Sequence, residues 1–525
     1  MSKTHSQNFM LSCVIRLWIC FSICITSLSA QVPVPLLHFS QIDLKAYKYC
    51  EKFEIQEAKN LLQHTKQLSN KTQYTSILIE NYADFLQLIC SENEKQYLQL
   101  LDNEELRLNN LEQFSNDTTY KFCQAEIKLQ WAFVHLKFGH EWRAFQNIRQ
   151  SFKLLKESEK LYPNFLPQQR SLGLLYILLS AVPENYQWAL SVFGLQGDEQ
   201  KGINYLQNVA QSNHFYANEA KLILALAQTF ILKQPEKALL TVQLYDLERK
   251  TLAEPENLLQ SFVLSWVYLK SGKAKKVLMI NEQIEDNILG EIAKFKENFR
   301  QKAKENLLRC DILLRVYVYA EALLLSNNLQ KSEKYYMLYS EYVEGNLYLK
   351  DCYYKLLLIH YLQNNTAKVH EYKQLILSKG TEKTSADRYA MSFAKKKLIL
   401  NKGLLIVRLL SDGGEYADAL QKLAQIDTNK LSILEDKVTY YYRTARILHK
   451  QKKYQTALHY YKIVLAKPLT ESYFAPNSAL QIALIYVELQ QILKAKYYAN
   501  LVENYRNYEY ENSIRGETKM LLRKL

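Results

Sequence analysis

The fold is decided by two stretches, residues 441–464 (YYRTARILHKQKKYQTALHYYKIV) and residues 479–502 (ALQIALIYVELQQILKAKYYANLV). The first stretch has alanines at Ala445 and Ala457, and the second has alanines at both corresponding positions, Ala483 and Ala495. Recurrence at a fixed period of this size is typical of repeat proteins. Large apolar residues recur at helical spacing between the alanines. The pattern therefore predicts consecutive pairs of helices that touch at their small residues.

The same period continues toward the N-terminus. Ala419 precedes Ala457 by the same interval that separates Ala457 from Ala495, although Val407 replaces the first small residue of that copy. Weaker matches occur further upstream, at irregular steps, and a charged insert at residues 291–306 interrupts them. A helical array without true repeats, in which these matches arise by chance, is the alternative. The small or branched residues that mark the weaker copies are Ala227, Ala238, Ser265, Val277, Ala320 and Ser332.

The best copy resembles the tetratricopeptide repeat (TPR) family. The resemblance implies an all-α fold, a right-handed superhelical solenoid of antiparallel helix pairs whose first helices line a concave groove. The family's period is about 34 residues, so the longer interval from Ala457 to Ala495 implies longer turns or helix ends. The residues that carry the resemblance are Tyr441, Ala445, Leu448, Tyr454, Ala457, Tyr461 and Val464.

Composition agrees with a helical chain. The 525 residues include only 13 Gly and 9 Pro, whereas 48% of the residues are hydrophobic. Glycine and proline mark turns, so their scarcity favours long runs of helix. We expect an N-terminal helical region at 31–215 and TPR-like repeats at 216–525, clearest at 400–505.

The first thirty residues have the features of a signal peptide. Lys3 and Arg16 precede the apolar run 17–28, which is too short to span a bilayer as a helix, and small residues follow at Ser29 and Ala30. The sequence therefore predicts export, to the periplasm, the outer membrane or the exterior. An uncleaved membrane anchor is the alternative.

Residues 160–206 differ from the rest, because they hold three of the prolines and four of the glycines. The order 162–165 (YPNF), 172–175 (LGLL), Trp188 and 193–198 (FGLQGD) resembles the tetratricopeptide repeat protein 39 / Iml2-like family and TPR proteins exported by Bacteroidetes-type bacteria. We expect the apolar run 172–182 to form a buried core helix; a binding loop is the alternative.

Cysteine use indicates no cofactor site. Five cysteines follow the signal, and none belongs to a C-x-x-C pair, so zinc and thioredoxin-like motifs are absent from the sequence. Isolated cysteines in a large helical protein are usually small buried side chains. One disulfide among Cys50, Cys90 and Cys123 is the alternative.

No enzyme motif or nucleic-acid module is present either. His140-Glu141 lacks the second histidine of a metalloprotease motif, and no Walker A or G-x-S-x-G sequence occurs. The net charge of +14 comes from scattered basic residues rather than a stripe. We therefore expect no catalytic residues, no metal, no cofactor and no nucleic acid.

The groove predicted by the TPR resemblance gives the candidate site. Side chains of the first helix that do not pack on its partner would face this groove, and guanidinium groups suit planar anions. The expected ligand is a protein or peptide, with an acidic one matching the basic face; a solvated basic surface without a partner is the alternative. The candidate residues are Arg408, Tyr442, Arg443, Arg446, His449 and Lys450.

The following copy has Leu480, Leu484 and Val487 at these positions. They predict either an apolar shelf beside the basic face or a contact with a C-terminal cap formed by 503–525.

Tyrosine is abundant, with 39 residues and several doublets. One member of each doublet is expected to fill the core while the other points outward.

The sequence as a whole predicts a non-catalytic interaction scaffold. A glycan-active enzyme with a carboxylate pair in a deep cleft, or a membrane-peripheral module with an exposed 172–182 face, are the alternatives.

Overall fold

The computed structural model describes residues 35–69, 73–91, 93–182, 188, 190–254, 257–281, 310–343, 345–396, 401–467, 469 and 471–525. Every regular element in these ranges is a helix and none is a strand, so the predicted all-α class is confirmed. The predicted signal at 1–30 and the charged insert at 291–306 lie outside the described residues.

The first half of the described chain contains the following helices: α2 (Gln41–Glu51), α3 (Ile55–Ser69), α4 (Tyr74–Ser91), α5 (Glu94–Leu100), α6 (Asn103–Leu111), α7 (Tyr120–Lys137), α8 (Glu141–Leu161), α9 (Leu166–Ser180), α11 (Glu199–Gln211), α12 (Ala217–Leu226), α13 (Pro235–Leu244), α14 (Leu247–Ala253) and α15 (Leu258–Lys270). Short helical segments η1 (Glu112–Phe114) and η2 (Ala227–Ile231) follow α6 and α12.

The second half contains α17 (Cys310–Leu325), α18 (Leu329–Tyr342), α19 (Leu349–Leu362), α20 (Thr366–Ser378), α21 (Ser385–Lys395), α22 (Lys402–Gly413), α23 (Tyr416–Ala424), α24 (Leu434–Lys450), α25 (Tyr454–Leu465), α26 (Phe474–Glu488), α27 (Ile492–Leu501) and α28 (Glu511–Lys524). Short segments η3 (Thr428–Lys430) and η4 (Val502–Asn504) follow α23 and α27.

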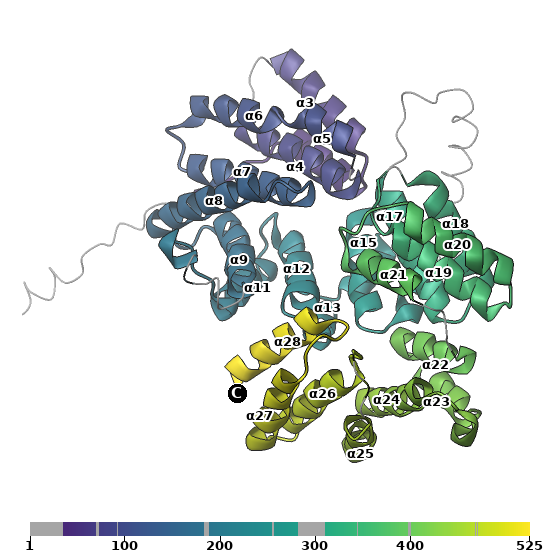
Figure 1. The fold of residues 1–525 in the computed structure, drawn as a ribbon. Coiled ribbons are helices and arrows are strands. Elements are labelled where there is room, and N and C mark those ends of the chain that lie inside the picture. Colours follow the sequence, from purple (N-terminus) through teal and green to yellow (C-terminus); the bar gives the residue numbers. More distant parts are fainter. Residues whose placement is uncertain are drawn as a thin grey trace, which may run out of the picture.

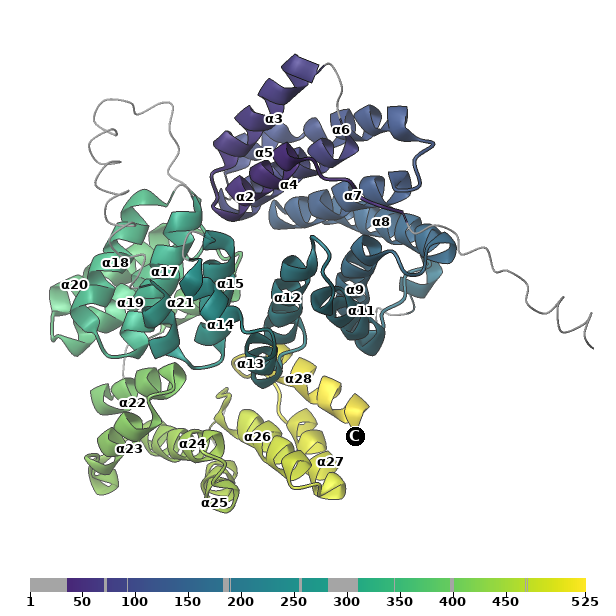
Figure 2. The ribbon, with the colours of Figure 1, turned by 180° about the vertical axis from the view of Figure 1, so that it is seen from behind.

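The helices follow a curved path that brings the C-terminus back to the middle of the chain (Figure 1). Seen from either side, α28 lies beside α13 (Figure 2). Lys524 of α28 pairs with Glu199 of α11 at 3.0 Å, and Lys450 of α24 pairs with Glu236 of α13 at 2.6 Å. These two ion pairs join helices that lie far apart in the sequence.

One left-handed turn recurs between the two helices of successive pairs. Lys452, between α24 and α25, has φ of +59°, and the N–H of Lys453 donates to the carbonyl of Leu448 at 2.9 Å. This bond is the Schellman end of a helix, which usually has glycine at the left-handed position. Because glycine is scarce here, polar residues often take its place. The turn residues of the other pairs are Gly139, Lys233, Gly272, Asn327, Asn364, Gly414 and Gln490.

A fully buried side chain lies five residues after most of these turns, and the paired helices touch at this side chain. In the pair α17–α18 the hydroxyl of Ser332 donates to the carbonyl of Ala320 at 2.8 Å, which joins the two predicted small positions directly. The pair α19–α20 differs, because its Val369 is half-buried. The weaker sequence matches thus fall on real helix pairs. The buried residues are Ala144, Ala238, Val277, Ser332, Ala419, Ala457 and Ala495.

The segment 160–206 forms a buried helix crossing, as predicted. Helix α9 carries most of the apolar run and crosses α11 at two glycines. A Cβ placed on Gly202 would lie 2.6 Å from the carbonyl oxygen of Gly173, and one placed on Gly197 would lie 2.2 Å from the nitrogen of Ser180. The two helices can approach this closely only because no side chain stands between them.

Replacing Gly202 by alanine should therefore destabilise the fold by about 1–3 kcal/mol, the usual range for overpacking a tight contact. The matched control is Gly516→Ala in α28, where an added Cβ meets nothing within 4 Å. That change should stabilise the helix by up to about 1 kcal/mol. Urea denaturation of both variants measures whether the two changes in unfolding free energy have opposite signs. Equal midpoints for Gly202→Ala and the wild type would show that the crossing is looser than described.

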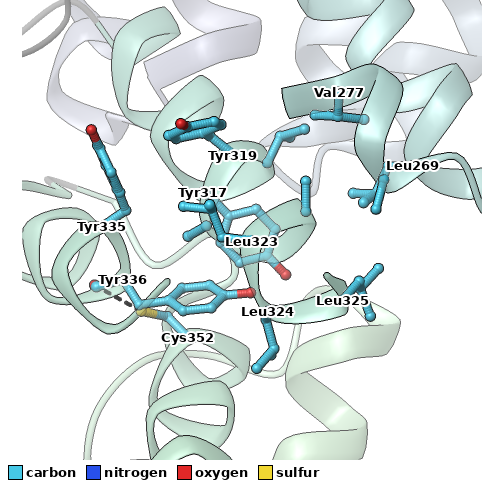
Figure 3. Close-up of a cluster of buried hydrophobic side chains, with 14 of the residues drawn as sticks. Leu269, Val277, Tyr317, Tyr319, Leu323, Leu324, Leu325, Tyr335, Tyr336 and Cys352 are labelled. Carbon is cyan, nitrogen blue, oxygen red and sulfur yellow. Dashed lines mark hydrogen bonds between the residues drawn. The ribbon is translucent and has the colours of Figure 1, made fainter. Parts of the chain in front are cut away.

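Tyrosines contribute heavily to the core between α17 and α19 (Figure 3). The expected division of each doublet is wrong for Tyr335–Tyr336, because both rings are buried. Helix α18 packs between α17 and α19, so side chains on two of its faces are covered. The doublet Tyr353–Tyr354 on α19 is buried in full for the same reason. The division holds for Tyr497–Tyr498, of which the first ring is 65% exposed.

Four of the five cysteines after the predicted signal are thiols and form no disulfide. Cys50, Cys123 and Cys352 are buried, and Cys90 is half-buried. The Cys352 thiol donates to the carbonyl of Tyr336 within the tyrosine-rich core (Figure 3). The alternative of a disulfide among the first three is thus wrong. The side chain of Cys310 lies outside the described residues.

Candidate functional site

Two adjoining cavities open on the interior side of the chain and contain most of the candidate residues. The first, called here the arginine chamber, has a volume of about 340 Å³ and lies between α22, α24, α26 and α28. The second, the lysine chamber, has a volume of about 430 Å³ and lies between α15, α17, α19, α22 and α24. The arginine chamber is lined by Arg408, Asp412, Arg443, Arg446, Tyr473, Tyr510 and Glu517, among others. The lysine chamber is lined by Lys270, Glu321, Asp351, Lys355, Arg408, Asp412 and Arg446, among others.

Arg408 and Arg446 occupy matching positions of consecutive repeats, and both line both chambers. Their helices α22 and α24 are the first helices of neighbouring pairs, so equal positions present side chains to the same side. The predicted common face of these two arginines is therefore present. They form a shared wall together with Asp412, which follows Arg408 by one helical turn.

Positive charge is in excess in the arginine chamber. Asp412 is shared: its Oδ1 lies 3.3 Å from Arg443 Nη1, and its Oδ2 lies 3.7 Å from Arg408 Nε. Arg446 has an amide partner instead and donates to Gln481 Oε1. Glu517 also lines the chamber, and burial raises its pKa. Guanidinium groups that have so few carboxylate partners can bind a further anion.

Arg443 is held in place by the chamber wall. Its Nη2 donates to the hydroxyl of Tyr473 at 3.2 Å, while its Nε is buried without a hydrogen-bond partner. The side chain is only 10% exposed. Arg443 therefore contributes charge to the chamber from a fixed position rather than as a mobile surface group.

Aromatic rings complete the arginine chamber. Tyr510, 45% exposed, stacks on Tyr389 at a centroid distance of 5.5 Å and meets Tyr473 edge-on at 5.4 Å. Tyr442, predicted to face the groove, lines the arginine chamber although it is almost fully buried, and its hydroxyl accepts a hydrogen bond from Asn477 at 3.0 Å. The ring of Tyr442 packs on Tyr473, which lines the same chamber.

His449 and Lys450 do not line the arginine chamber. His449 Nδ1 lies 3.4 Å from the hydroxyl of Tyr461. Burial, together with the nearby Arg446 and Lys450, lowers the pKa of His449 to about 3, so the ring is neutral near pH 7. Lys450 lines the lysine chamber but pairs with Glu236. His449 lines neither chamber and is not part of a patch with the arginines, whereas Lys450 shares the lysine chamber with Arg408 and Arg446.

The lysine chamber contains carboxylates that already have partners. Glu321 accepts from Lys355 Nζ at 2.7 Å and from the hydroxyl of Tyr336. Burial raises the pKa of Glu321, but the charge and hydrogen bond of Lys355 outweigh burial and lower the pKa overall. Asp351 accepts from the hydroxyl of Tyr317 at 2.5 Å, and its pKa is raised by burial and by Glu321.

The C-terminal segment covers the predicted apolar shelf. Leu480 is buried and Leu484 half-buried in a cluster that includes Ile514 of α28. Val487 instead packs with the core of the pairs α24–α25 and α26–α27. The cap alternative is therefore confirmed for the two leucines, and α28 at the same time closes one side of the arginine chamber through Tyr510 and Glu517.

Several residues that line the chambers were not among the candidates predicted from the sequence. Asp412 could have been found, since it stands one turn after Arg408 on the same helical face. Tyr473, Tyr510 and Lys270 could not, because they reach the chambers only through the way distant helices pack.

Within the described part of the chain, no cluster of three or more histidine, cysteine or acidic side chains is arranged to hold a metal ion. Among the same residues, no helix combines the length and the apolar character needed to cross a bilayer. The run at 172–182, whose exposure would have favoured membrane contact, contributes mostly buried residues to α9. Neither a protein-family model nor a curated protein sequence matches this chain.

Proposed function

We propose that this protein is a non-catalytic interaction scaffold that binds an acidic protein or peptide at the arginine chamber. The single observation that carries the proposal is the sharing of Asp412 by two guanidinium groups, Arg408 and Arg443, beside a third, Arg446, that forms no direct ion pair with a carboxylate of the described residues. Arginine groups in a cavity of this kind bind carboxylates through paired hydrogen bonds.

We also propose that the helix pairs form a TPR-like right-handed solenoid with the chambers on its concave side. The recurring left-handed turn and the buried small residues after it support repeats of one kind. Export, directed by residues 1–30, remains part of the proposal on the sequence pattern of that segment alone.

A glycan-active enzyme remains the second candidate, because Glu321 and Asp351 both line the lysine chamber and their pKa values are shifted in opposite directions. Pairs of this kind can serve as base and acid. However, Lys355 neutralises Glu321 and Tyr336 occupies its other oxygen, which is the arrangement of a structural ion pair. The scaffold function is therefore favoured.

Binding of fluorescein-labelled hexaglutamate, followed by anisotropy at an ionic strength of about 0.1 M, tests the scaffold proposal. The double variant Arg408→Gln/Arg446→Gln should bind at least about tenfold more weakly, which corresponds to ~1.4 kcal/mol. Arg249→Gln is the matched control, since Arg249 is 81% exposed on α14 and pairs with Asp246 outside both chambers. It should leave the affinity unchanged.

Asp412→Asn provides a test that does not depend on removing an arginine. This change frees Arg408 and Arg443 from their shared carboxylate, so hexaglutamate should bind more tightly. Equal affinity of the wild type, the double variant and Asp412→Asn would contradict the proposal, as would equal binding of hexaglutamine.

A further inference from the structure

Lys270 stands out in the lysine chamber because it forms no direct ion pair within the described part of the chain, although the charges of Glu321 and Asp351 act on it from a distance. It ends α15, lines the cavity and places its Nζ 5.5 Å from the ring centroid of Trp266. No ion pair joins it to a carboxylate among the described residues. Three acidic groups line the chamber. Glu321 and Asp351 are engaged with Lys355 and with tyrosine hydroxyls. Asp412 pairs with Arg408 and Arg443.

The two chambers adjoin each other, because Arg408, Asp412 and Arg446 line both. Each volume, about 340 and 430 Å³, is within the range of small-ligand pockets. A ligand held by the guanidinium groups can therefore extend past the shared wall toward Lys270.

We infer that the acidic ligand carries two anionic clusters, one bound by Arg408, Arg443 and Arg446 and the other by the ammonium group of Lys270. This inference rests on the proposed function of the arginine chamber and specifies which kind of acidic peptide fits. A lysine ammonium is a compact point charge that pairs with any carboxylate within reach, so the second contact requires charge rather than a fixed geometry.

The surroundings of Lys270 support a ligand contact at this position. Burial lowers the pKa of Lys270; the charges of Glu321 and Asp351 oppose this, and those of Lys355 and Lys233 add to it, so that the pKa is lowered overall. An arriving carboxylate would offset both effects, so the positive charge of Lys270 is better stabilised in the complex than in the free protein.

The test compares two acetylated, amidated peptides on the full chain. The one-cluster peptide has a diglutamate, a flexible Gly/Ser spacer and a diglutamine; in the two-cluster peptide a second diglutamate replaces the diglutamine. Spacers of increasing length cover the distance between the chambers. We expect the best two-cluster peptide to bind about fivefold more tightly, the gain of one ion pair at a partly exposed site.

Lys270→Gln should remove this gain and leave the affinity of the one-cluster peptide unchanged. Lys273→Gln is the matched control, because Lys273 is exposed just after the end of α15, lines neither chamber and changes the net charge equally. Lys273→Gln should leave the affinity of both peptides unchanged.

The outcomes separate the two claims. If the one-cluster peptide binds but no two-cluster peptide gains, or if Lys270→Gln preserves the gain, the second anionic contact is overturned and the arginine chamber stands. If no peptide of either kind binds, the proposed function is overturned and the inference with it.

Discussion

Replacing Arg170 by methionine should lower the free energy of unfolding by about 3–5 kcal/mol, because it leaves the buried carboxylate of Glu126 and the half-buried one of Glu219 without their cation. Arg170 of α9 is 3% exposed and joins Glu126 of α7 at 2.6 Å and Glu219 of α12 at 2.8 Å. Its guanidinium also lies 3.9 Å from the ring centroid of Tyr216. The single positive charge of Arg170 thus joins helices α7, α9 and α12.

Urea denaturation followed by circular dichroism measures the loss, and hydrogen exchange locates it in α7, α9 and α12. Arg249→Met is the control, since an exposed ion pair such as that of Arg249 with Asp246 contributes at most about 1 kcal/mol. The triple variant Arg170→Met/Glu126→Gln/Glu219→Gln should recover most of the stability, because no buried charge remains unpaired. A loss below about 1 kcal/mol for Arg170→Met would contradict a buried network.

His449 should make the folded state sensitive to acid. Its pKa falls from 6.5 to about 3 on folding, so between these values the unfolded chain binds a proton that the folded chain does not. The stability contributed by the neutral ring is complete above pH 6.5 and is lost progressively as the pH falls toward 3. At pH 4 the loss amounts to about 3 kcal/mol.

The measurement is the difference in unfolding free energy between pH 7.5 and pH 4, obtained by urea denaturation. His449→Gln should reduce this difference by about 3 kcal/mol. Replacing the exposed His64 by glutamine should leave it unchanged. An equal acid dependence of the wild type and His449→Gln would show that water reaches the ring in the folded state.

The helix pairs can be predicted from the sequence more readily than the turns that connect their helices. Alanines such as Ala457 and Ala495 fix a period because only small residues fit where paired helices touch. The turn residues Lys452 and Gln490 carry no such signal, because a left-handed backbone favours glycine but does not require it. The copy around Ala144, which follows the turn at Gly139, is present in the structure without a clear repeat signature in the sequence.

The same contrast applies to the candidate site. Arg408 and Arg446 share a face because the repeat places them there, and helical spacing alone was enough to pair them. His449 lies on the same helix as Arg446 but lines neither chamber, because it packs against Tyr461 of α25. Lys270 and Tyr510 enter the chambers from segments that lie far away in the chain, so only the packing of distant helices brings them to the site.

A crystal structure of the full chain with bound hexaglutamate is the most direct measurement of the central claim. We expect a peptide carboxylate within hydrogen-bond distance, about 2.7–3.2 Å, of the guanidinium groups of Arg408 and Arg446. Glutamate ordered on the outer surface, with the arginine chamber free of peptide at saturating concentration, would contradict the assignment of this chamber as the binding site.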